Sequence, residues 1–331
     1  MNRLLSSLFG LVLALGLSLG LTGCVTSGLA VTATSPWQPL KLNTAASPLD
    51  LAFSDDRHGF LVGSNRLILE TNDGGTSWQD RELALPAGDN YRLISIDFNG
   101  QEGWIAGQPG LLLHSTDAGQ NWERLLLDTK LPGEPYLITA LGSLQAELAT
   151  NVGAIYRTED GGSSWQAEVS DAAGAVRDLR RSPDGQYVSV SSLGNFFATW
   201  VPGQEIWQPH QRVSSQRVQS MGFQPGGTLW MVTRGAQLRF NADAADLDQW
   251  SKPIIPITNG FGYLDMAWDP TGAIWAGGGS GTLLVSRDGG SSWQRDAVGA
   301  EQPTNFNRIV FTPDGKGFVL GERGNLLRWV A

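Results

Sequence analysis

The chain has 331 residues, of which 41% are hydrophobic and 17% are charged. Its 42 glycines and 13 tryptophans favour all-β structure with frequent tight turns, and its net charge of −9 argues against nucleic acid as a partner. The single cysteine, Cys24, excludes an intrachain disulfide, and the sequence lacks metal-ligating spacings of His and Cys, so we expect no cofactor and no metal.

The first 23 residues have the pattern of an export signal. Arg3 is the only charge before Cys24, an apolar run covers 4–21, and the segment ends in Leu-Thr-Gly-Cys, which resembles a bacterial lipobox. We therefore predict a lipoprotein signal peptide at 1–23, lipid attachment at Cys24 and a flexible, Ser/Thr/Ala-rich tether at 24–36. An uncleaved membrane anchor is the alternative, because the run approaches the roughly 20 residues that span a bilayer.

A repeat organises the rest of the chain. Seven tryptophans recur at intervals of 41 to 44 residues: Trp37, Trp78, Trp122, Trp165, Trp207, Trp250 and Trp293. The intervals hold short apolar segments, such as 51–53, 59–63 and 67–69, separated by glycine-containing turns. Four short strands in each interval are typical of a propeller blade.

The two ends of the repeat predict how the ring closes. Three strands are expected after Trp293, near 306–311, 317–320 and 325–330, and no eighth tryptophan strand follows them. The segment around Trp37 has the tryptophan strand but lacks the three that should precede it. We therefore predict a seven-bladed β-propeller over 37–331, in which the N-terminal strand completes the last blade.

Four of the tryptophans follow a turn that resembles the Asp-box, Ser-x-Asp-x-Gly-x-Thr-Trp. These turns begin at Asp73, Asp117, Asp160 and Asp288. An aspartate can accept backbone N–H groups within such a turn, glycine permits a positive φ, and the tryptophan fills space between blades. Sialidases also carry Asp-boxes, so an exo-glycosidase is one alternative, but a structural role for the turns is favoured.

The alternation of side chains along the innermost strands predicts which residues line the central channel. Phe53, Phe98, Phe223, Trp268 and Phe311 align as core positions. The opposite parity should face the channel: Asp50, Ser95, Asp97, Asp178, Arg180, Ser220, Asp265 and Arg308. Because arginines accompany the carboxylates and no Ser-His-Asp order is recognisable, we expect a polar, wet channel in a protein that is not an enzyme.

Arginines are distributed unevenly. Seven lie within 177–239, opposed by only three acidic residues: Arg177, Arg180, Arg181, Arg212, Arg217, Arg234 and Arg239. Arg181 occupies a slot that is aromatic in other repeats, and such departures from a repeat's own rule often mark function or strain. These seven residues are therefore predicted to form a partner-binding surface that attracts an acidic partner. The alternative is that each arginine pairs locally or covers apolar surface.

The segments 175–185 and 214–223, together with the Asp-boxes and the lipobox, resemble the photosystem II stability/assembly factors of cyanobacteria and chloroplasts. The resemblance covers nearly the whole mature chain. It implies a lumenal propeller, lipid-anchored on the thylakoid membrane, which binds photosystem II reaction-centre polypeptides and early assembly complexes during assembly and repair. We expect such a protein to be a monomer. A generic envelope scaffold is a further alternative.

Overall fold

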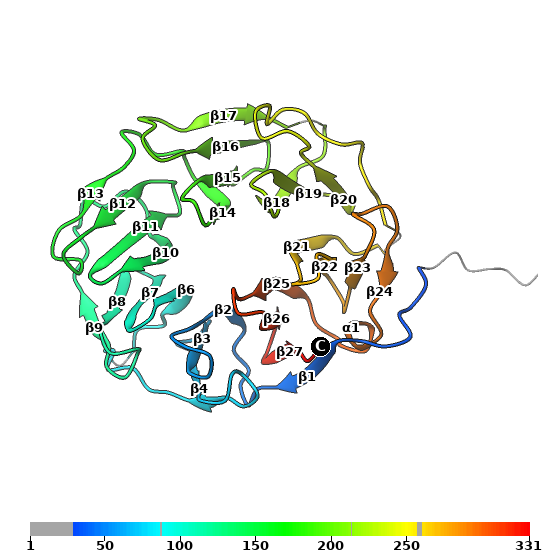
Figure 1. Ribbon diagram of the computed structural model, residues 1–331. Coiled ribbons are helices and arrows are strands. Elements are labelled where there is room, and N and C mark those ends of the chain that lie inside the picture. Colours follow the sequence, from blue (N-terminus) through cyan, green and yellow to red (C-terminus); the bar gives the residue numbers. More distant parts are fainter. Residues whose placement is uncertain (1–28, 87, 213, 257–259) are drawn as a thin grey trace, which may run out of the picture.

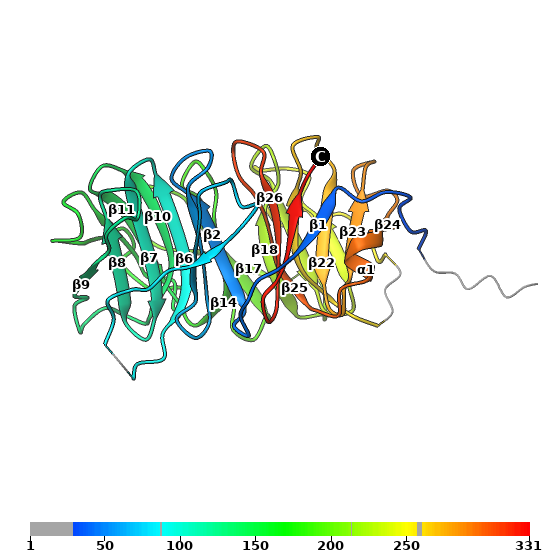
Figure 2. The same cartoon turned by 90° about the horizontal axis from the view of Figure 1, so that it is seen from below.

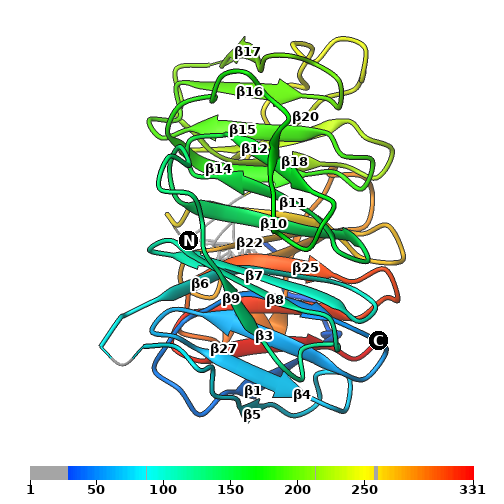
Figure 3. The same ribbon diagram turned by 90° about the vertical axis from the view of Figure 1, so that its left-hand side faces the viewer.

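The computed structural model describes residues 29–86, 88–212, 214–256 and 260–331, so the predicted signal peptide and Cys24 lie outside the described residues. Within this part of the chain, seven antiparallel sheets stand around a central axis like the blades of a propeller (Figure 1). The all-β, seven-bladed fold is therefore confirmed. Seen from the side, the turns and connections gather on two opposite faces of the ring (Figure 2, Figure 3).

The first three blades follow one another from residue 48 to residue 167. Blade 1 consists of β2 (Pro48–Phe53), β3 (Gly59–Gly63), β4 (Ile68–Thr71) and β5 (Gln79–Asp80). Blade 2 consists of β6 (Arg92–Asn99), β7 (Glu102–Gln108), β8 (Leu111–Ser115) and β9 (Glu123–Leu125). Blade 3 consists of β10 (Pro135–Gly142), β11 (Gln145–Thr150), β12 (Ile155–Thr158) and β13 (Gln166–Ala167). In each blade the first strand is innermost.

The other four blades complete the ring. Blade 4 consists of β14 (Val176–Arg181), β15 (Tyr187–Ser191), β16 (Phe196–Trp200) and β17 (Gln208–Gln211). Blade 5 consists of β18 (Val218–Phe223), β19 (Leu229–Thr233) and β20 (Gln237–Phe240). Blade 6 consists of β21 (Tyr263–Trp268), β22 (Ile274–Gly278), β23 (Leu283–Ser286) and β24 (Gln294–Arg295). Blade 7 consists of β25 (Phe306–Phe311), β26 (Gly317–Gly321), β27 (Asn325–Trp329) and β1 (Trp37–Lys41).

The ring closes as the sequence predicts. β1 pairs antiparallel with β27, with Trp37 opposite Trp329 and Lys41 opposite Asn325, so blade 7 has the order β1-β27-β26-β25. The buried Trp37 ring makes edge contacts with Trp275 at 5.3 Å and Trp329 at 5.0 Å between ring centroids. The closing strand is thus held by backbone pairing and by an aromatic cluster.

Blade 5 departs from the expected count of four strands. Its outer position is taken by an irregular segment that forms only two isolated bridges, between Asn241 and Trp250 and between Leu238 and Ile254. Leu238 and Ile254 exchange both backbone hydrogen bonds, at 2.8 and 2.9 Å. Pro253 lies beside Ile254 and has no N–H to donate, which limits regular pairing here.

The core lies between the blades. Each apolar cluster draws on two neighbouring sheets, for example Phe60 and Val62 of blade 1 with Ile96 and Ile105 of blade 2. The repeat tryptophans follow the same rule. Trp122 of blade 2 meets Phe60 of blade 1 with ring centroids 5.9 Å apart. The tryptophan period therefore records the packing of each blade against the preceding one.

The Asp-box turns are closed by their own side chains. Asp73 accepts the N–H of Ser77 at 2.9 Å and the hydroxyls of Thr71 and Ser77 at 2.8 and 2.6 Å. These bonds lower the pKa of Asp73 to about 2, with the Ser77 hydroxyl the largest cause. Gly75 has a φ of 81°, and a Cβ there would lie 2.5 Å from the Phe318 ring. Asp160 and Asp288 form the same contacts. Asp117 differs only in accepting the Asn121 side-chain amide in place of the second hydroxyl.

Part of the predicted tether lies along blade 6. Val31 forms a parallel bridge with Arg295, whose N–H donates to the Ala30 carbonyl at 2.9 Å. The Ser35 hydroxyl donates at 3.0 Å to Asp296, the buried N-cap of the short helix α1 (Ala297–Ala300). In the described residues, no helix has the length and apolar character needed to cross a membrane.

Replacing Trp37 with alanine should weaken ring closure. Removing a large buried aromatic side chain leaves a cavity and typically costs about 3–5 kcal/mol, which we expect as a lower free energy of unfolding in urea. Leu126→Ala is the control, because Leu126 is 89% exposed, and its effect should stay within about 0.5 kcal/mol. Equal effects of the two substitutions would contradict the closing role of Trp37.

Candidate functional site

The channel wall is built from seven innermost strands that have no further strand on their channel side. Such edge strands leave N–H groups without ladder partners. Each strand also has a register shift before its third or fourth residue, for example between Pro48 and Asp50 in β2. In each strand the residue that follows this third or fourth residue, such as Leu51 in β2, donates its backbone N–H to a side-chain oxygen.

Three aspartates and one serine accept all seven of these bonds. Each aspartate takes the N–H that follows it in its own strand and the equivalent N–H of the next blade. Asp50 accepts from Leu51 and Ile96, at 2.9 and 3.1 Å. Asp178 accepts from Leu179 and Met221, both at 3.1 Å. Asp265 accepts from Met266 and Ile309, both at 2.8 Å, and Ser95 accepts from Ile138 at 3.2 Å.

Two channel arginines balance these buried acids. Arg180 lies 2.9 Å from Asp265 and 3.3 Å from Asp178, and Arg308 lies 3.2 Å from Asp50. Burial raises the pKa of Asp50 and Asp265, and the nearby arginines oppose that rise. Burial by itself lowers the pKa of Arg180, but Asp178 and Asp265 raise it above its ordinary value. Arg180 therefore holds a fixed charge within the wall.

Arg181 occupies the core position that the alignment assigns to it. In blade 2 this position holds Phe98, which stacks on Phe60 of the preceding blade with centroids 5.7 Å apart. Arg181 instead pairs with the buried Glu147 of blade 3 at 2.7 Å, and the Tyr187 hydroxyl donates to the same carboxylate at 2.7 Å. An ion pair thus replaces an aromatic stack between blades 3 and 4.

These contacts change the interpretation of the arginine cluster. The acids available within 177–239 are few, but Arg180 and Arg181 also reach acids of blades 6 and 3, which lie 85 and 34 positions away. Both side chains belong to the framework of the ring. Breaking such a buried pair leaves an uncompensated charge, so substitution of either arginine should affect folding as well as any binding.

The remaining arginines differ in exposure. Arg177 and Arg217 precede or begin inner strands, and Arg234 lies in the turn between β19 and β20, so all three lie on the face where inner strands begin, which we call the arginine face. All three are exposed, and Arg212, in the connection between β17 and β18, is half-buried. Within the described residues, none of these four has a carboxylate within 4.0 Å.

Local contacts place two members of this group beside each other. The Arg234 N–H donates to the Arg217 carbonyl at 2.9 Å. The Arg177 guanidinium reaches the Val218 carbonyl at 3.2 Å and so spans from blade 4 to blade 5. Arg239 stands apart. It lies within β20, donates to the Ser251 carbonyl at 3.0 Å, and burial lowers its pKa.

The channel is a cavity of about 910 Å³ whose lining residues reach both faces of the ring. Arg92 and Tyr136 line it on the arginine face, whereas Asp55, Asp56 and Asp314 line it on the opposite face. The mouth on the arginine face therefore carries the Arg92 charge, whereas the opposite mouth carries acidic side chains, of which Asp314 pairs with Lys316. Arg92 was not among the predicted site residues, because it belongs to blade 2 and lies far along the chain from the arginine cluster. Its position at the start of an inner strand is the sequence feature that could have identified it as a channel residue.

Of the inner-strand aspartates Asp50, Asp97, Asp178 and Asp265, Asp97 alone has no arginine nitrogen within 4.0 Å in the described part of the chain. Its Oδ2 accepts the Ala140 N–H at 2.9 Å. Burial raises the pKa of Asp97 to about 7. Burial likewise raises the pKa of Tyr136 to about 12, and the Tyr136 hydroxyl donates to the Arg177 carbonyl at 3.2 Å. The Asp97 carboxyl and the Tyr136 hydroxyl are therefore uncharged at pH values below about 7.

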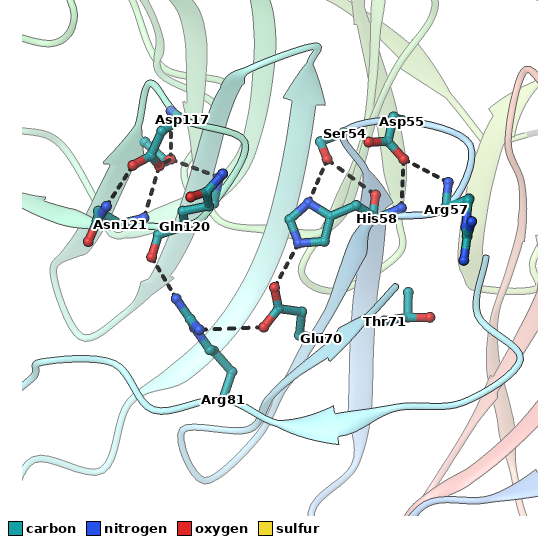
Figure 4. A network of polar contacts seen from close by, with 12 residues as sticks. Ser54, Asp55, Arg57, His58, Glu70, Thr71, Arg81, Asp117, Gln120 and Asn121 are labelled. Carbon is teal, nitrogen blue, oxygen red and sulfur yellow. Dashed lines mark hydrogen bonds and ion pairs between the residues drawn. The ribbon is translucent and has the colours of Figure 1, made fainter. Parts of the chain in front are cut away.

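Ser54, His58 and Glu70 form a chain of Ser-His-acid contacts that could not be recognised from their order in the sequence (Figure 4). Ser54 Oγ lies 3.0 Å from His58 Nδ1, and His58 Nε2 lies 2.7 Å from Glu70. Ser54 Oγ also bonds to the His58 carbonyl at 3.2 Å, as in a turn that closes on itself. Arg81 lies 3.5 Å from Glu70 and donates to the Gln120 carbonyl at 2.6 Å, so the network joins blade 1 to the Asp-box turn of blade 2.

The described residues contain no group of three or more His, Cys, Asp or Glu side chains arranged to hold a metal ion. Cys24, the predicted lipid-attachment residue, falls outside the part of the chain that the structure describes. The site that the structure presents is therefore a surface of exposed arginines beside a polar channel.

Comparison with known proteins adds independent information. The model of the family described as photosynthesis system II assembly factor YCF48 matches residues 29–330. The photosystem II assembly lipoprotein Ycf48 of Parasynechococcus marenigrum is 69% identical over 330 residues, covering 100% of this chain and 99% of the relative. A solved structure of YCF48 bound to D1 peptide is 46% identical, with a TM-score of 0.89, covering 92% of this chain and 98% of that one. YCF48 from Cyanidioschyzon merolae is 37% identical, with a TM-score of 0.83 and coverage of 89% and 98%.

Removing an aspartate from the channel wall should destabilise the ring. Asp265→Ala leaves the N–H groups of Met266 and Ile309 without their acceptor and removes a partner of Arg180, so we expect a loss of about 3–5 kcal/mol in urea unfolding. The double variant Asp265→Ala/Arg180→Met should cost at least about 1 kcal/mol less than the sum of the single variants. Additive costs would show that the two side chains act independently.

The Asp97 carboxyl should make stability depend on pH. With a folded pKa of about 7 and an ordinary value of 3.8, Asp97 is protonated in the folded chain and ionised in the unfolded chain between these values. Folding then takes up a proton, so stability falls as pH rises through this window and levels off above it. Asp97→Asn should reduce the fall over this window by on the order of 4 kcal/mol, since each unit of pKa difference corresponds to about 1.4 kcal/mol. Asp80→Asn, at an exposed position, should leave it unchanged.

Proposed function

The chain belongs to the photosynthesis system II assembly factor YCF48 family, and we propose that it is a non-catalytic assembly factor that binds newly made photosystem II reaction-centre polypeptides. The observation that carries this proposal is the group of exposed arginines on one face of blades 4 and 5, none of which has a nearby carboxylate among the described residues. Such a surface attracts and orients an acidic segment of a partner.

The partner follows from the comparisons and from the charge of the two mouths. A relative of the same fold has been solved in complex with D1 peptide. On this chain, the mouth opposite the arginine face carries Asp55, Asp56 and Asp314, which would repel an acidic segment. The arginine face, centred on Arg177, Arg217 and Arg234 with Arg212 and Arg92 nearby, is therefore the docking surface that we propose for a reaction-centre polypeptide.

The hydrogen bonds and ion pairs of the channel acids agree with a non-catalytic role. Asp50, Asp178 and Asp265 each accept two backbone N–H groups, and each lies within 3.3 Å of an arginine nitrogen. Glycoside hydrolysis requires one carboxyl group that donates a proton and a second that is free to act as base or nucleophile. Carboxylates occupied by the framework are poorly placed for either task.

The lipobox and the names of the relatives support a proposal for the location of the protein. Curated relatives with 55% to 69% identity are named lipoproteins. We propose that Cys24 carries the lipid and that the propeller is a monomer on the lumenal side of the thylakoid membrane. The segment 1–23 would then be absent from the mature protein.

Charge reversal on the arginine face should abolish partner binding without unfolding the ring. We expect Arg177→Glu/Arg217→Glu to weaken binding of a D1 peptide by at least about 100-fold, because two attractive contacts become repulsive. Fluorescence anisotropy with a labelled peptide measures this change. The free energy of unfolding should fall by only about 1 kcal/mol, the cost of losing one hydrogen bond from Arg177 to the Val218 carbonyl.

The matched control is Arg124→Glu/Arg287→Glu, which makes the same change in net charge at exposed positions of blades 2 and 6, with Arg287 on the face opposite the arginine face. This variant should bind the peptide within about threefold of the unmodified protein, because charges beyond about 10 Å are largely screened at 0.1 M salt. If both variants lose binding equally, the effect belongs to net charge and the proposed docking surface is wrong.

A further inference from the structure

The chain between the predicted lipid and the propeller is short. Leu29 packs against the core cluster between blades 5 and 6, and Ala30 bonds to Arg295 of β24. Cys24 precedes Leu29 by five residues, which span at most about 18 Å when fully extended. A lipid on Cys24 therefore keeps the outer edge of blade 6 close to the bilayer surface, wherever the other blades lie.

Exposed apolar side chains gather at the same part of the ring. Among the described residues, nine large hydrophobic side chains are exposed, and four of them belong to blade 6, to the segment that enters it, or to the N-terminal segment beside it: Val31, Ile255, Phe261 and Leu264. We call these four residues the apolar stripe. Single exposed hydrophobic residues are normal on a soluble surface, but a grouped set indicates a contact surface.

Contacts connect the stripe from the rim toward the channel. Ile254, next to Ile255, packs against the same cluster as Leu29, so the outer end of the stripe lies beside the start of the described chain. The Tyr263 hydroxyl bonds to the Pro256 carbonyl at 3.4 Å and joins the two sides of the connection into blade 6. Leu264 lines a small cavity with Arg234, so the inner end of the stripe reaches the arginine face.

We propose that the apolar stripe on blade 6 is a membrane-contact surface that inserts into the lipid headgroup region and fixes the orientation of the propeller. The occupant is a lipid bilayer, since the lipid on Cys24 brings this edge of the molecule to the membrane. The lipid supplies attachment, and the stripe supplies orientation, because a single flexible anchor leaves a protein free to rotate. This inference rests on the lipid anchor of the proposed function.

The orientation has a defined consequence for binding. Phe261 and Leu264 lie on the arginine face, at the start of the first strand of blade 6. With the stripe at the bilayer, the edge of the arginine face beside blades 5 and 6 lies next to the headgroups. The exposed arginines are then held near polypeptide segments that emerge from the membrane.

Depth-dependent quenching tests the proposal on the acylated full-length protein. With Cys24 carrying lipid, Phe261→Cys or Leu126→Cys introduces the one free thiol, which is labelled with an environment-sensitive fluorophore. The protein is reconstituted on vesicles of equal parts phosphatidylcholine and phosphatidylglycerol that contain a spin-labelled lipid. We expect quenching to be about threefold or more stronger at position 261 than at position 126, which follows β9 of blade 2.

A second labelled variant, Ile255→Cys, tests the proposal independently if Phe261→Cys does not fold. Its label should be quenched as strongly as a label at position 261. Equal quenching at 126 and 255 would overturn the proposal, and so would failure of the acylated protein to float with the vesicles. The D1 peptide titration on the same samples is a separate readout. Loss of peptide binding with the quenching pattern intact would contradict the proposed function and leave the membrane orientation standing.

Discussion

The backbone N–H groups that face the channel are the constraint on which the rest of the ring depends. Seven inner strands meet at the axis, and each presents an N–H that its own sheet does not use. Asp50, Asp178, Asp265 and Ser95 accept all seven, and each links neighbouring blades in doing so. Three acids in a narrow channel then require cations nearby, which explains why arginines enter the wall.

That requirement divides the arginine cluster into two groups with different tasks. Arg180 neutralises the acids of blades 4 and 6, and Arg181 joins blades 3 and 4 through Glu147. Arg177, Arg217 and Arg234 make no such pairs among the described residues and face solvent. The framework arginines keep blade 4 in register with its neighbours and so hold the exposed arginines in fixed positions. A binding surface of this kind is rigid before its partner arrives, which reduces the entropy lost on association.

Much of this architecture could be predicted from the sequence, because it follows from local periodicity. The tryptophan interval predicted seven blades. Alternation along the inner strands predicted six of the residues that line the channel, whereas Ser220 and Asp265 are buried within its wall. The ion pairs could not be predicted, since Asp265 and Glu147 come from blades distant in sequence from Arg180 and Arg181. The Ser54–His58–Glu70 contacts also depend on the packing of β4 beside a turn. Blade 5 lost its fourth strand where Pro253 and an irregular segment replace regular pairing.

The closing pair of strands sets the order in which the protein can mature. Among the described residues, β1 is the first strand to be synthesised, yet its partner β27 is the last. The early strand must stay unpaired until almost the whole polypeptide has been made, and contacts of such long sequence separation form slowly. A chain that is cut short would keep most of its blades and still leave Trp37 exposed. Ring closure therefore requires that the last blade has been completed.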